Sequence, residues 1–367
     1  METKTKKRLL GWAGALGLIA CAMAGGMTYL AKHAPAEPEE RDMIVDPAMR
    51  TAVIEGVIAN LNQAYVFPER AVEIEKGLRR QLQRGELDAV RSANALARTL
   101  TDRLKALAHG DQHLEVRYFA EALPPPSPDG EASAAEQTAL ALKMRRLNAG
   151  FETVGRFRGN IGYLELHKFW RPKDVAPKLP AAMKLLADTD ALIIDLRDCG
   201  GGDPETVMLV ASFLFDEATH LNDVYWRDEN RLEARWTSAT VEGERYGGRR
   251  KIYVLISSET ASGCEDLAYA LKNAGRATLI GETTAGAAHA GSPKRLTEHF
   301  MMFVPTGRPV SPVTHTDWEG VGVTPHVKTP AAAALKVAQV VALKGIIAAE
   351  KDVVWREKLE RTLRDLE

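Results

Sequence analysis

The chain has 367 residues, and its 48 lysines and arginines nearly balance its 49 aspartates and glutamates, which gives a formal net charge of −1. Because a domain takes about 150 residues, this length predicts two or three domains. A near-neutral charge argues against a dedicated nucleic-acid binder, which needs a basic face. The 45% hydrophobic and 26% charged residues are typical of a globular protein and exclude a disordered, collagen-like or polytopic membrane chain.

The N-terminal segment predicts export. A basic stretch at 4–8 precedes an uncharged apolar run at 9–24, which is the pattern of a secretory signal. Leu18 to Cys21 resembles a bacterial lipobox, in which Cys21 is the lipid-attachment residue. Two other kinds of processing stay open. Signal peptidase would cleave after Ala24, or the apolar segment would remain as an uncleaved anchor long enough to span a membrane.

All three alternatives place the rest of the chain outside the cytoplasm, in the periplasm, and two of them anchor it to the membrane. We therefore assign 1–21 to the signal or lipoprotein segment and the Pro- and charge-rich segment 22–45 to a tether. A helical N-terminal domain is expected over 46–118, because Asp46-Pro47 is a helix start and three stretches with helical spacing follow it. Prolines and polar residues then predict a linker over 119–155.

Strands and helices alternate from about residue 156, which predicts an α/β catalytic domain over 156–332 and a C-terminal helix over 333–367. We expect strands at 161–166, 191–196, 251–256 and 277–280, and helices at 181–186, 205–215 and 265–273.

Two strand ends are expected to converge, because sites in α/β sheets form where strands end and helices begin. Three glycines at 200–202 follow the strand at 191–196 and would let backbone N–H groups approach a ligand. They fit an oxyanion hole, a phosphate loop or simply a tight turn. Ser262 lies between small residues after the strand at 251–256 and fits either an exposed nucleophile or a helix N-cap, with Glu265 completing a capping box.

A serine nucleophile needs a base and an orienting carboxylate. His113 and His289 are the candidate bases, and Glu319, between a tryptophan and glycines, is a candidate carboxylate. No HExxH motif and no CxxC pair is present, so neither a metal nor a cofactor is expected. Besides Cys21, the cysteines are Cys199 and Cys264, which fall in the two converging loops; whether they pair stays open.

Seven motifs in the same order resemble the tail-specific (C-terminal processing) serine protease family. The similarity is greatest to the subgroup that includes the interphotoreceptor retinoid-binding protein repeats and the tricorn protease core. The motifs are spread through the segment from about 50 to 330, which the resemblance covers: Tyr65–Glu69, Gly110–Leu114, Gly159–Leu164, Asp195–Gly202, Thr260–Glu265, Gly281–Gly286 and Trp318–Pro325.

The resemblance implies a crotonase-like ββα catalytic core with a small helical domain, and it implies that Ser262 is the nucleophile. Many members pair the serine with a lysine, but Ala287 stands at that position here, so no catalytic lysine is expected. The tricorn-like arrangement instead implies a catalytic set of Ser262, His113 and Glu319. The oxyanion hole would be formed by the N–H groups of Gly263, Gly200, Gly201 and Gly202.

The sequence therefore predicts a serine-type endopeptidase that hydrolyses a peptide or protein substrate. The alternative is a non-catalytic, hydrophobic-ligand-binding relative of the retinoid-binding repeats. A PDZ-like substrate reader does not fit between 119 and 155, so specificity for protein tails is not assumed. The apolar stripe of the C-terminal helix would be a docking face or would pack on the parent domain; it comprises Val337, Val341, Leu343, Ile346 and Ile347.

Overall fold

The structure is a computed structural model that describes residues 42–108, 111, 113–123, 134–227 and 229–367. It contains two compact units. The first comprises the described part of Met1–Ala141 together with Val224–Glu233 and His289–Pro309, and the second comprises Leu142–Asp223, Ala234–Ala288 and Val310–Glu367. Residues 224–233 and 289–309 thus belong to the first unit, although the sequence analysis places them in the α/β catalytic domain.

Three predicted helices form in the first unit: α3 (Pro47–Ala64), α4 (Pro68–Gln83) and α5 (Ala93–Leu107). Asp46 caps α3 as predicted, because its carboxylate accepts the N–H of Met49 at 2.7 Å. The apolar faces of the three helices meet in one core.

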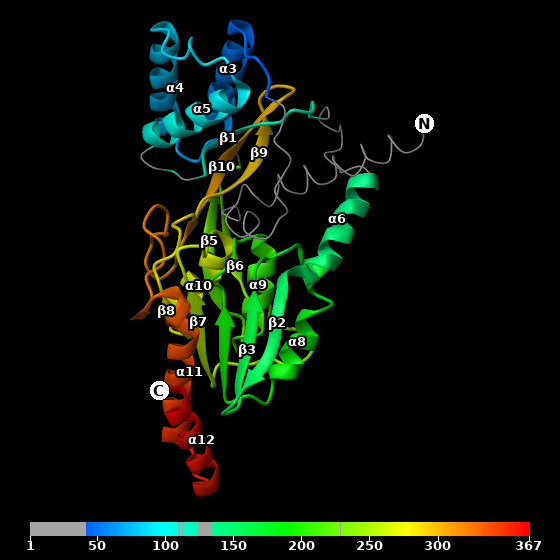
Figure 1. Ribbon diagram of the computed structural model, residues 1–367, viewed down its shortest axis with the longest axis vertical. Coiled ribbons are helices and arrows are strands. Elements are labelled where there is room, and N and C mark those ends of the chain that lie inside the picture. The colour runs from blue at the N-terminus through cyan, green and yellow to red at the C-terminus, as the bar shows by residue number, and fades with distance from the viewer. Residues whose placement is uncertain (1–41, 109–110, 112, 124–133, 228) are drawn as a thin grey trace. The chain divides into compact units, whose positions relative to one another are not determined.

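The helices of the first unit pack against a sheet that the sequence analysis missed. Its strand order is β1 (Glu115–Tyr118), β10 (Phe300–Val310), β5 (His220–Trp226) and β6 (Arg231–Trp236), and β9 (Ala290–Arg295) also pairs with β10. Phe300, Met302 and Val304 of β10 are buried in the same core as the three helices. The helical bundle is therefore one layer of a helix-on-sheet unit (Figure 1).

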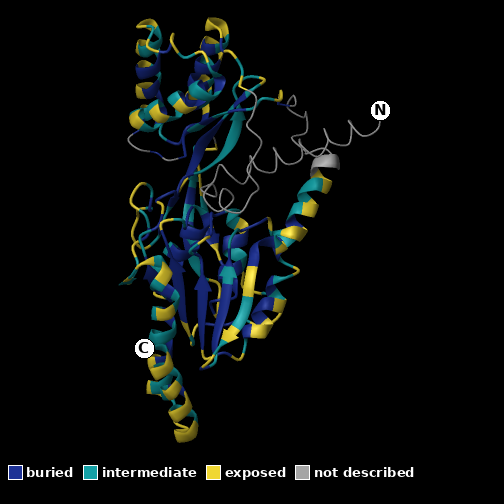
Figure 2. Ribbon diagram, in the orientation of Figure 1, coloured by how far each residue is buried: buried dark blue, intermediate teal, exposed yellow. Residues whose placement is uncertain are grey.

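A six-stranded sheet forms the centre of the second unit, in the order β11 (Val327–Lys328), β8 (Ala277–Gly281), β7 (Lys251–Ile256), β4 (Ala191–Asp195), β3 (Ile161–Leu166) and β2 (Phe151–Phe157). All neighbouring strands are parallel except the β2–β3 pair. The central strands are almost entirely buried, as Figure 2 shows, which explains why they were predictable as short apolar runs.

Helices cover both faces of this sheet. On one face, α11 (Ala331–Ala349) and α12 (Val353–Leu366) pack on side chains such as Tyr163 and Leu255. On the other face, Leu186 of α8 (Leu179–Leu186) lies over Gly162 and Leu192. The remaining helices are α6 (Ala134–Arg146), α7 (Pro172–Val175), α9 (Pro204–Ser212) and α10 (Gly263–Asn273), with a 3-10 turn at Asn148–Gly150.

The two ends of the α/β segment differ from the expected ranges. Helix α6 lies inside the segment expected to be a linker, and β2 begins at Phe151, before the expected start of the α/β domain. The single C-terminal helix of the sequence analysis is two helices, α11 and α12. The apolar stripe of α11 contacts the core of the second unit, which supports the packing interpretation.

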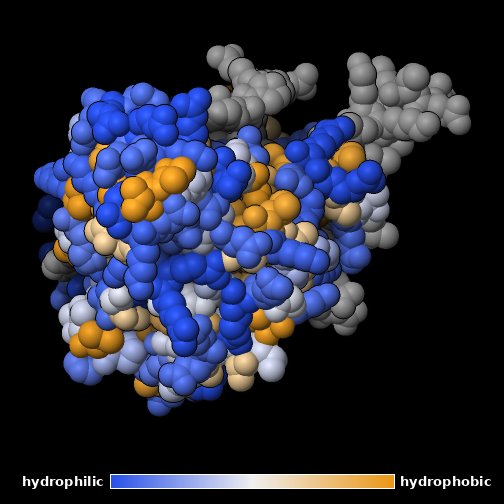
Figure 3. Space-filling view, turned by 90° about the horizontal axis from the view of Figure 1, so that it is seen from below, coloured by the Kyte–Doolittle hydropathy of each residue, from blue (hydrophilic) through white to orange (hydrophobic). Residues whose placement is uncertain are grey.

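Among the described residues, α11 is the one helix that is long and apolar enough to cross a membrane by length and composition. Four of its side chains are buried against the sheet: Ala334, Ala338, Ala342 and Leu343. The face of the molecule in Figure 3 is mainly hydrophilic, and its hydrophobic residues form separate small groups. The predicted signal segment and Cys21 lie outside the described residues.

Candidate active site

The loops that follow β4 and β7 meet in the second unit, as predicted. The two strands are parallel neighbours, with Asp195 beside Leu255 near their carboxyl ends. The N–H of Ala261 donates to the carbonyl oxygen of Cys199 at 3.0 Å, and the Thr260 hydroxyl donates to the carbonyl oxygen of Leu196 at 2.7 Å. The glycine loop and the serine loop are therefore hydrogen-bonded to each other.

Ser262 occupies a strained turn between β7 and α10. Its φ is 53° and its ψ is −124°, and it is the N-cap residue of α10. A non-glycine residue with such a backbone costs about 1–3 kcal/mol, and strain of this kind is concentrated at functional sites. The serine of an α/β-hydrolase lies on a similar strand-to-helix turn, which exposes its hydroxyl. Ser262 is half-buried.

The glycine loop lies directly against Ser262. A Cβ atom at Gly201 would lie 2.6 Å from Cβ of Ser262, and one at Gly202 would lie 1.9 Å from the carbonyl oxygen of Phe169. Both glycines also have positive φ, at 92° and 138°. Only glycine lets the loop lie this close to Ser262 and Phe169. The glycines therefore serve both as the tight turn and as the close backbone approach that the sequence suggested.

Two amides in these loops remain available to a ligand. The N–H of Gly200 donates to the carbonyl oxygen of His167 at 3.2 Å, and that of Gly201 donates to Sγ of Cys264 at 3.0 Å. Within the described part of the chain, the N–H groups of Gly202 and Gly263 have no hydrogen-bond acceptor. Of the four amides predicted to donate to an oxyanion, those of Gly200 and Gly201 therefore already have acceptors, and those of Gly202 and Gly263 are the candidates that remain.

A disulfide joins the two loops. Cys199 and Cys264 are bonded, with their Cα atoms 6.0 Å apart. From the sequence alone, this pairing was one of two open alternatives. The bond ties the start of the glycine loop to the residue two positions after Ser262, so it constrains the nucleophile and both candidate amides together.

Glu265 is a site residue, and only its capping bond to Ser262 was expected from the sequence. It is fully buried, and its two carboxylate oxygens accept from four donors: the N–H groups of Ser262, Gly286 and Ala287 and the hydroxyl of Thr284, at 2.5–2.8 Å. Burial raises the pKa of Glu265, although these hydrogen bonds lower it. The capping-box pattern predicted the bond to Ser262 but not the bonds to 284–287.

Carboxylates hold the backbone of the segment 286–288. The N–H of Ala287 donates to Glu265 at 2.8 Å. The next N–H, of Ala288, donates to Glu319 at 2.7 Å, and the N–H of Gly320 donates to the carbonyl oxygen of Gly286 at 2.8 Å. Glu319 is therefore linked to Ser262 in three steps. Glu319 accepts the N–H of Ala288, the neighbouring N–H of Ala287 donates to Glu265, and Glu265 accepts the N–H of Ser262.

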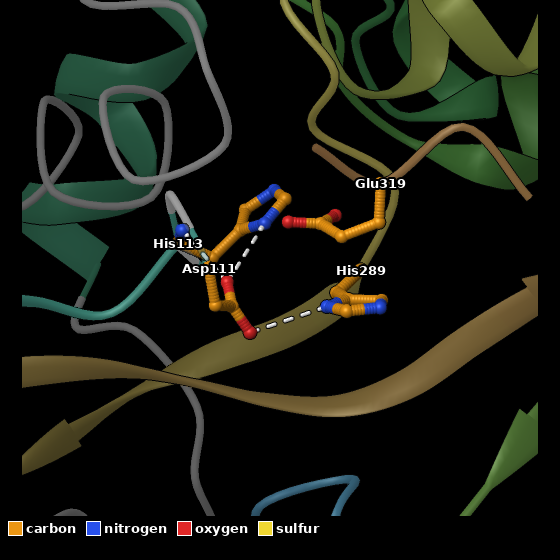
Figure 4. Close-up of side chains that lie close together, drawn as sticks. All are labelled: Asp111, His113, His289 and Glu319. Carbon is orange, nitrogen blue, oxygen red and sulfur yellow. Dashed lines mark hydrogen bonds and ion pairs between the residues drawn. The ribbon is translucent and has the colours of Figure 1, made fainter. Parts of the chain in front are cut away.

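The other predicted catalytic residue, His113, belongs to the first unit. It is buried, and Nδ1 of its ring lies 3.7 Å from Oδ1 of Asp111. Nδ1 of His289 lies 3.2 Å from Oδ2 of the same carboxylate (Figure 4). Tyr65 donates its hydroxyl to Oδ2 at 2.8 Å. Both histidines that the sequence singled out thus share one aspartate, which it did not single out.

These three residues also offer donor atoms that a metal would accept. One carboxylate oxygen of Asp111 and one nitrogen each of His113 and His289 lie within 4.8 Å of one another. Nitrogen and carboxylate ligands of this kind suit Zn²⁺ and similar ions. The expectation of no metal came from local motifs, which do not detect ligands spread over 111, 113 and 289.

Two family models match the chain. The model described as peptidase family S41 matches residues 160–329, and the model described as the N-terminal domain of peptidase S41 in eukaryotic IRBP matches residues 35–148. The chain belongs to peptidase family S41. The resemblance and the α/β fold class expected from the sequence are confirmed.

Curated relatives of this S41 chain are plant processing enzymes. Carboxyl-terminal-processing peptidase 2, chloroplastic, of Arabidopsis thaliana is 30% identical over 180 residues, which are 46% of this chain and 32% of the relative. Carboxyl-terminal-processing peptidase 1 of the same plant is 30% identical over 195 residues, which are 52% and 37% of the two chains. The match thus spans about a third of the length of these relatives.

Solved structures with the same fold include a lipoprotein from Streptococcus agalactiae. It has a TM-score of 0.53 and 13% identity, and the match covers 83% of this S41 chain and 99% of the other. A candidate peptidase from Parabacteroides merdae has a TM-score of 0.51 and 15% identity, with 77% and 90% covered. At this identity the two structures show the fold alone.

Proposed function

We propose that this chain is a serine endopeptidase that uses Ser262, His113 and Glu319 and no catalytic lysine. Ser262 is the nucleophile and His113 is the general base. Glu319 is the carboxylate that supports the polar network of the site. The N–H groups of Gly202 and Gly263 stabilise the oxyanion, and a peptide or protein is the substrate.

In this mechanism His113 takes the proton of the Ser262 hydroxyl as Oγ attacks the carbonyl carbon of the peptide. The tetrahedral oxyanion binds the two amides, and His113 then gives its proton to the leaving amine. Water, activated by the same histidine, attacks the acyl-enzyme. This releases the carboxylic acid and restores the Ser262 hydroxyl.

The observation that carries the proposal is the combination of a strained serine with unpaired amides. Ser262 has a positive φ, and the two N–H groups without acceptors in the described residues lie in the glycine loop and directly after Ser262. A helix start alone explains the unpaired N–H of Gly263, but it requires neither the positive φ of Ser262 nor an unpaired N–H at Gly202 of the glycine loop. Glu265 supports the same arrangement, because it fixes both the Ser262 amide and the loop at 284–287.

A fluorophosphonate probe tests the nucleophile on the full-length chain. We expect labelling of the wild type and loss of labelling in Ser262→Ala. Ser258→Ala is the matched control, because Ser258 is an exposed serine of the same loop and its variant should label normally. Labelling that persists in Ser262→Ala, or a wild type that does not label, would refute the proposal.

A turnover assay tests the base. We expect His113→Ala to lose at least about 1,000-fold in kcat/KM, since base and nucleophile act as a unit. His315→Ala is the control, because His315 is exposed in the second unit. Equal turnover in both variants would assign the base role to another residue.

A second candidate function is the binding of a hydrophobic ligand without catalysis. The match of residues 35–148 to the N-terminal domain model from IRBP favours it. A fluorescent retinoid is a suitable probe. Saturable binding by both the wild type and Ser262→Ala, together with no fluorophosphonate labelling, would establish this function in place of the peptidase.

We also propose that the protein is exported and anchored through Cys21. The basic and apolar N-terminal segment supports export, and so does the disulfide, because disulfides persist in oxidising compartments. Incorporation of labelled palmitate, abolished in Cys21→Ser, would establish the lipid anchor. The ranges 1–21, 22–45, 46–118, 119–155, 156–332 and 333–367 remain our proposed division of the chain.

A further inference from the structure

Two imidazoles and one carboxylate of the first unit meet in the protein interior. One oxygen of Asp111 and one nitrogen each of His113 and His289 lie within 4.8 Å of one another (Figure 4). Oδ2 of Asp111 is 3.2 Å from Nδ1 of His289, and Oδ1 is 3.7 Å from Nδ1 of His113. The three residues are each at most 4% exposed. Two nitrogen donors and one carboxylate form a ligand set that Zn²⁺ and similar ions accept.

The strands of the first unit fix the positions of these donors. Strand β1 begins two residues after His113, and β9 begins directly after His289. Both strands pair with β10, and their first residues lie opposite Phe303 and Gly307, so both histidines fall at the same end of β10. The backbone N–H of His113 donates to Oδ1 of Asp111 at 3.0 Å, which holds the carboxylate at the same point. A ligand set that the fold positions in this way costs little ordering entropy when an ion binds.

The Asp111 carboxylate is supported by other donors and keeps acceptor capacity. Oδ1 accepts the His113 amide, and Oδ2 accepts the Tyr65 hydroxyl at 2.8 Å. Each oxygen has about two lone pairs, so each can accept one partner more. On Oδ2 this second partner is Nδ1 of His289, and a bound ion would take its place between the two side chains. Carboxylates that bind metals usually have such supporting hydrogen bonds, which orient them and tune the ion.

Phenylalanine rings lie against the two imidazoles. The ring of Phe67 packs edge-on against His289, with centroids 5.2 Å apart, and the ring of Phe303 lies 5.8 Å from that of His113. An apolar surround of this kind restricts water around a metal site and strengthens the interaction between the ion and the carboxylate. It also disfavours Mg²⁺ and Ca²⁺, which prefer oxygen ligands and water. The surroundings therefore suit an ion that binds nitrogen, such as Zn²⁺.

We propose that Asp111, His113 and His289 bind one Zn²⁺ ion or a similar divalent transition-metal ion, with water in the fourth position. Zinc takes nitrogen and carboxylate oxygen at about 2.0–2.2 Å, so neighbouring ligand atoms around a tetrahedral ion lie about 3.4 Å apart. The separations of 3.2 and 3.7 Å between Asp111 and the two imidazoles are close to this value. Tyr65 orients the carboxylate and is not itself a ligand.

Zinc at this position inhibits the peptidase. This part of the inference rests on the proposed function, in which His113 is the general base. A neutral imidazole has one lone pair in the ring plane, carried by one of its two nitrogens. When that lone pair binds Zn²⁺, none is left to accept the proton of the Ser262 hydroxyl, so the nucleophile is not activated. Removal of the ion restores the lone pair, and the inhibition is therefore reversible.

Calorimetric titration with ZnCl₂ measures binding without any need for activity. In full-length Ser262→Ala protein, freed of metal with EDTA and dialysed, we expect one Zn²⁺ per chain. Asp111→Asn and His289→Gln should each lose at least about 100-fold in affinity, and Tyr65→Phe about 10-fold, because a lost ligand costs more than a lost supporting hydrogen bond. His220→Gln is the matched control, since His220 pairs with Asp223 at 2.7 Å outside the cluster and its variant should bind normally.

Three results would overturn the metal site. One is Ser262→Ala protein that binds no Zn²⁺, whatever the other variants show. Another is full-strength binding in a folded His289→Gln variant. Co²⁺ provides a further measurement that needs no substitution in the cluster, because a tetrahedral site gives Co²⁺ an intense visible absorption, whereas the octahedral ion in water absorbs weakly. A spectrum that keeps the weak octahedral band after Co²⁺ is added is the third contrary result.

Turnover of the active enzyme tests the inhibition. With free Zn²⁺ at about ten times the measured dissociation constant, we expect kcat/KM to fall about tenfold and to recover when EDTA is added. The same concentration of Mg²⁺ should change nothing. His289→Gln should keep its own metal-free turnover when zinc is added. An active enzyme that binds Zn²⁺ at this site without losing turnover overturns the inhibition, whereas an inactive metal-free wild type overturns the peptidase and leaves the binding result standing.

Discussion

The serine site of the second unit and the histidine cluster of the first unit are assembled in different ways. Ser262 and the glycine loop follow two neighbouring parallel strands, so each half of the site is a continuous strand–loop–helix segment. The histidine cluster combines residues 65, 111, 113 and 289 through antiparallel pairing with β10. A site of the first kind can be recognised from local sequence, whereas a site of the second kind can be recognised only when the strand pairing is known.

The sharpest way to break the serine site is to add one methyl group to the glycine loop. Gly201→Ala would place Cβ 2.6 Å from Cβ of Ser262 at a φ of 92°. We expect a loss of about 4 kcal/mol in unfolding free energy, from backbone strain plus overpacking, and at least about 100-fold in turnover. Gly275→Ala is the matched control, since Gly275 also has positive φ but nothing lies within 4 Å of its Cβ position. Equal losses in urea denaturation would show that the contact with Ser262 is unimportant.

Removing the disulfide should have the next largest effect and should also affect the serine site. The bond closes a segment of 65 residues, and disulfides of this kind contribute about 3 kcal/mol to the unfolding free energy. The double variant Cys199→Ser/Cys264→Ser should lose this amount and be insensitive to a phosphine reductant, whereas the wild type loses stability when reduced. Urea denaturation with and without reductant measures both. A reductant-insensitive wild type would contradict the expected role of the bond.

Glu265→Gln tests whether the serine site depends on a buried charge. All four partners of Glu265 are donors: three are backbone N–H groups, and the fourth is the Thr284 hydroxyl, which donates because an ionised carboxylate only accepts. The amide NH₂ of glutamine would face donors, so we expect a loss of about 2–3 kcal/mol. Glu217→Gln, at an exposed glutamate, should change nothing measurable. A stable, active Glu265→Gln protein would reduce Glu265 to an ordinary helix cap.

The sheet of the second unit was predictable because the sequences of its strands fit few other kinds of secondary structure. Runs such as Ala191–Asp195 and Lys251–Ile256 are short, apolar and bounded by turn residues. The sheet of the first unit was missed, because β9 and β10 contain prolines and glycines and half of the residues of β6 are charged. Such segments become strands through pairing with distant partners, which local patterns do not encode.

The same limit applies to the sites. Ser262 and the glycines were found from local sequence, while His113 and Glu319 were given their roles by the family resemblance. Asp111 and His289 are 178 positions apart, so only the register of β1, β9 and β10 reveals that they meet. A charged residue two positions before a candidate base was visible, but nothing local showed that it was buried or shared.

Two buried carboxylates allow a final, smaller test of the contrast between the units. Asp111 has a lowered pKa, so the folded state binds its proton more weakly than the unfolded chain does. Its stabilising contribution is complete above pH about 4 and is lost as the pH falls. Glu265 has a raised pKa, so the folded state binds its proton more tightly. Its contribution therefore improves as the pH falls and weakens as the pH rises above about 4.

Urea denaturation should show these opposite signs in two pH intervals: between about 5 and 3 for Asp111, with a change of about 1 kcal/mol, and between about 7 and 4 for Glu265. The stability difference between the wild type and Asp111→Asn should shrink as the pH falls, because the wild type loses the charged Asp111. The difference between the wild type and Glu265→Gln should grow as the pH falls from about 7 to 4, because the folded wild type binds the Glu265 proton more tightly than the unfolded chain does. If both differences move in the same direction, one of the two carboxylates has been assigned the wrong charge state. That result would show either that Asp111 is not a charged partner of His113 or that Glu265 is not a buried charge beside Ser262.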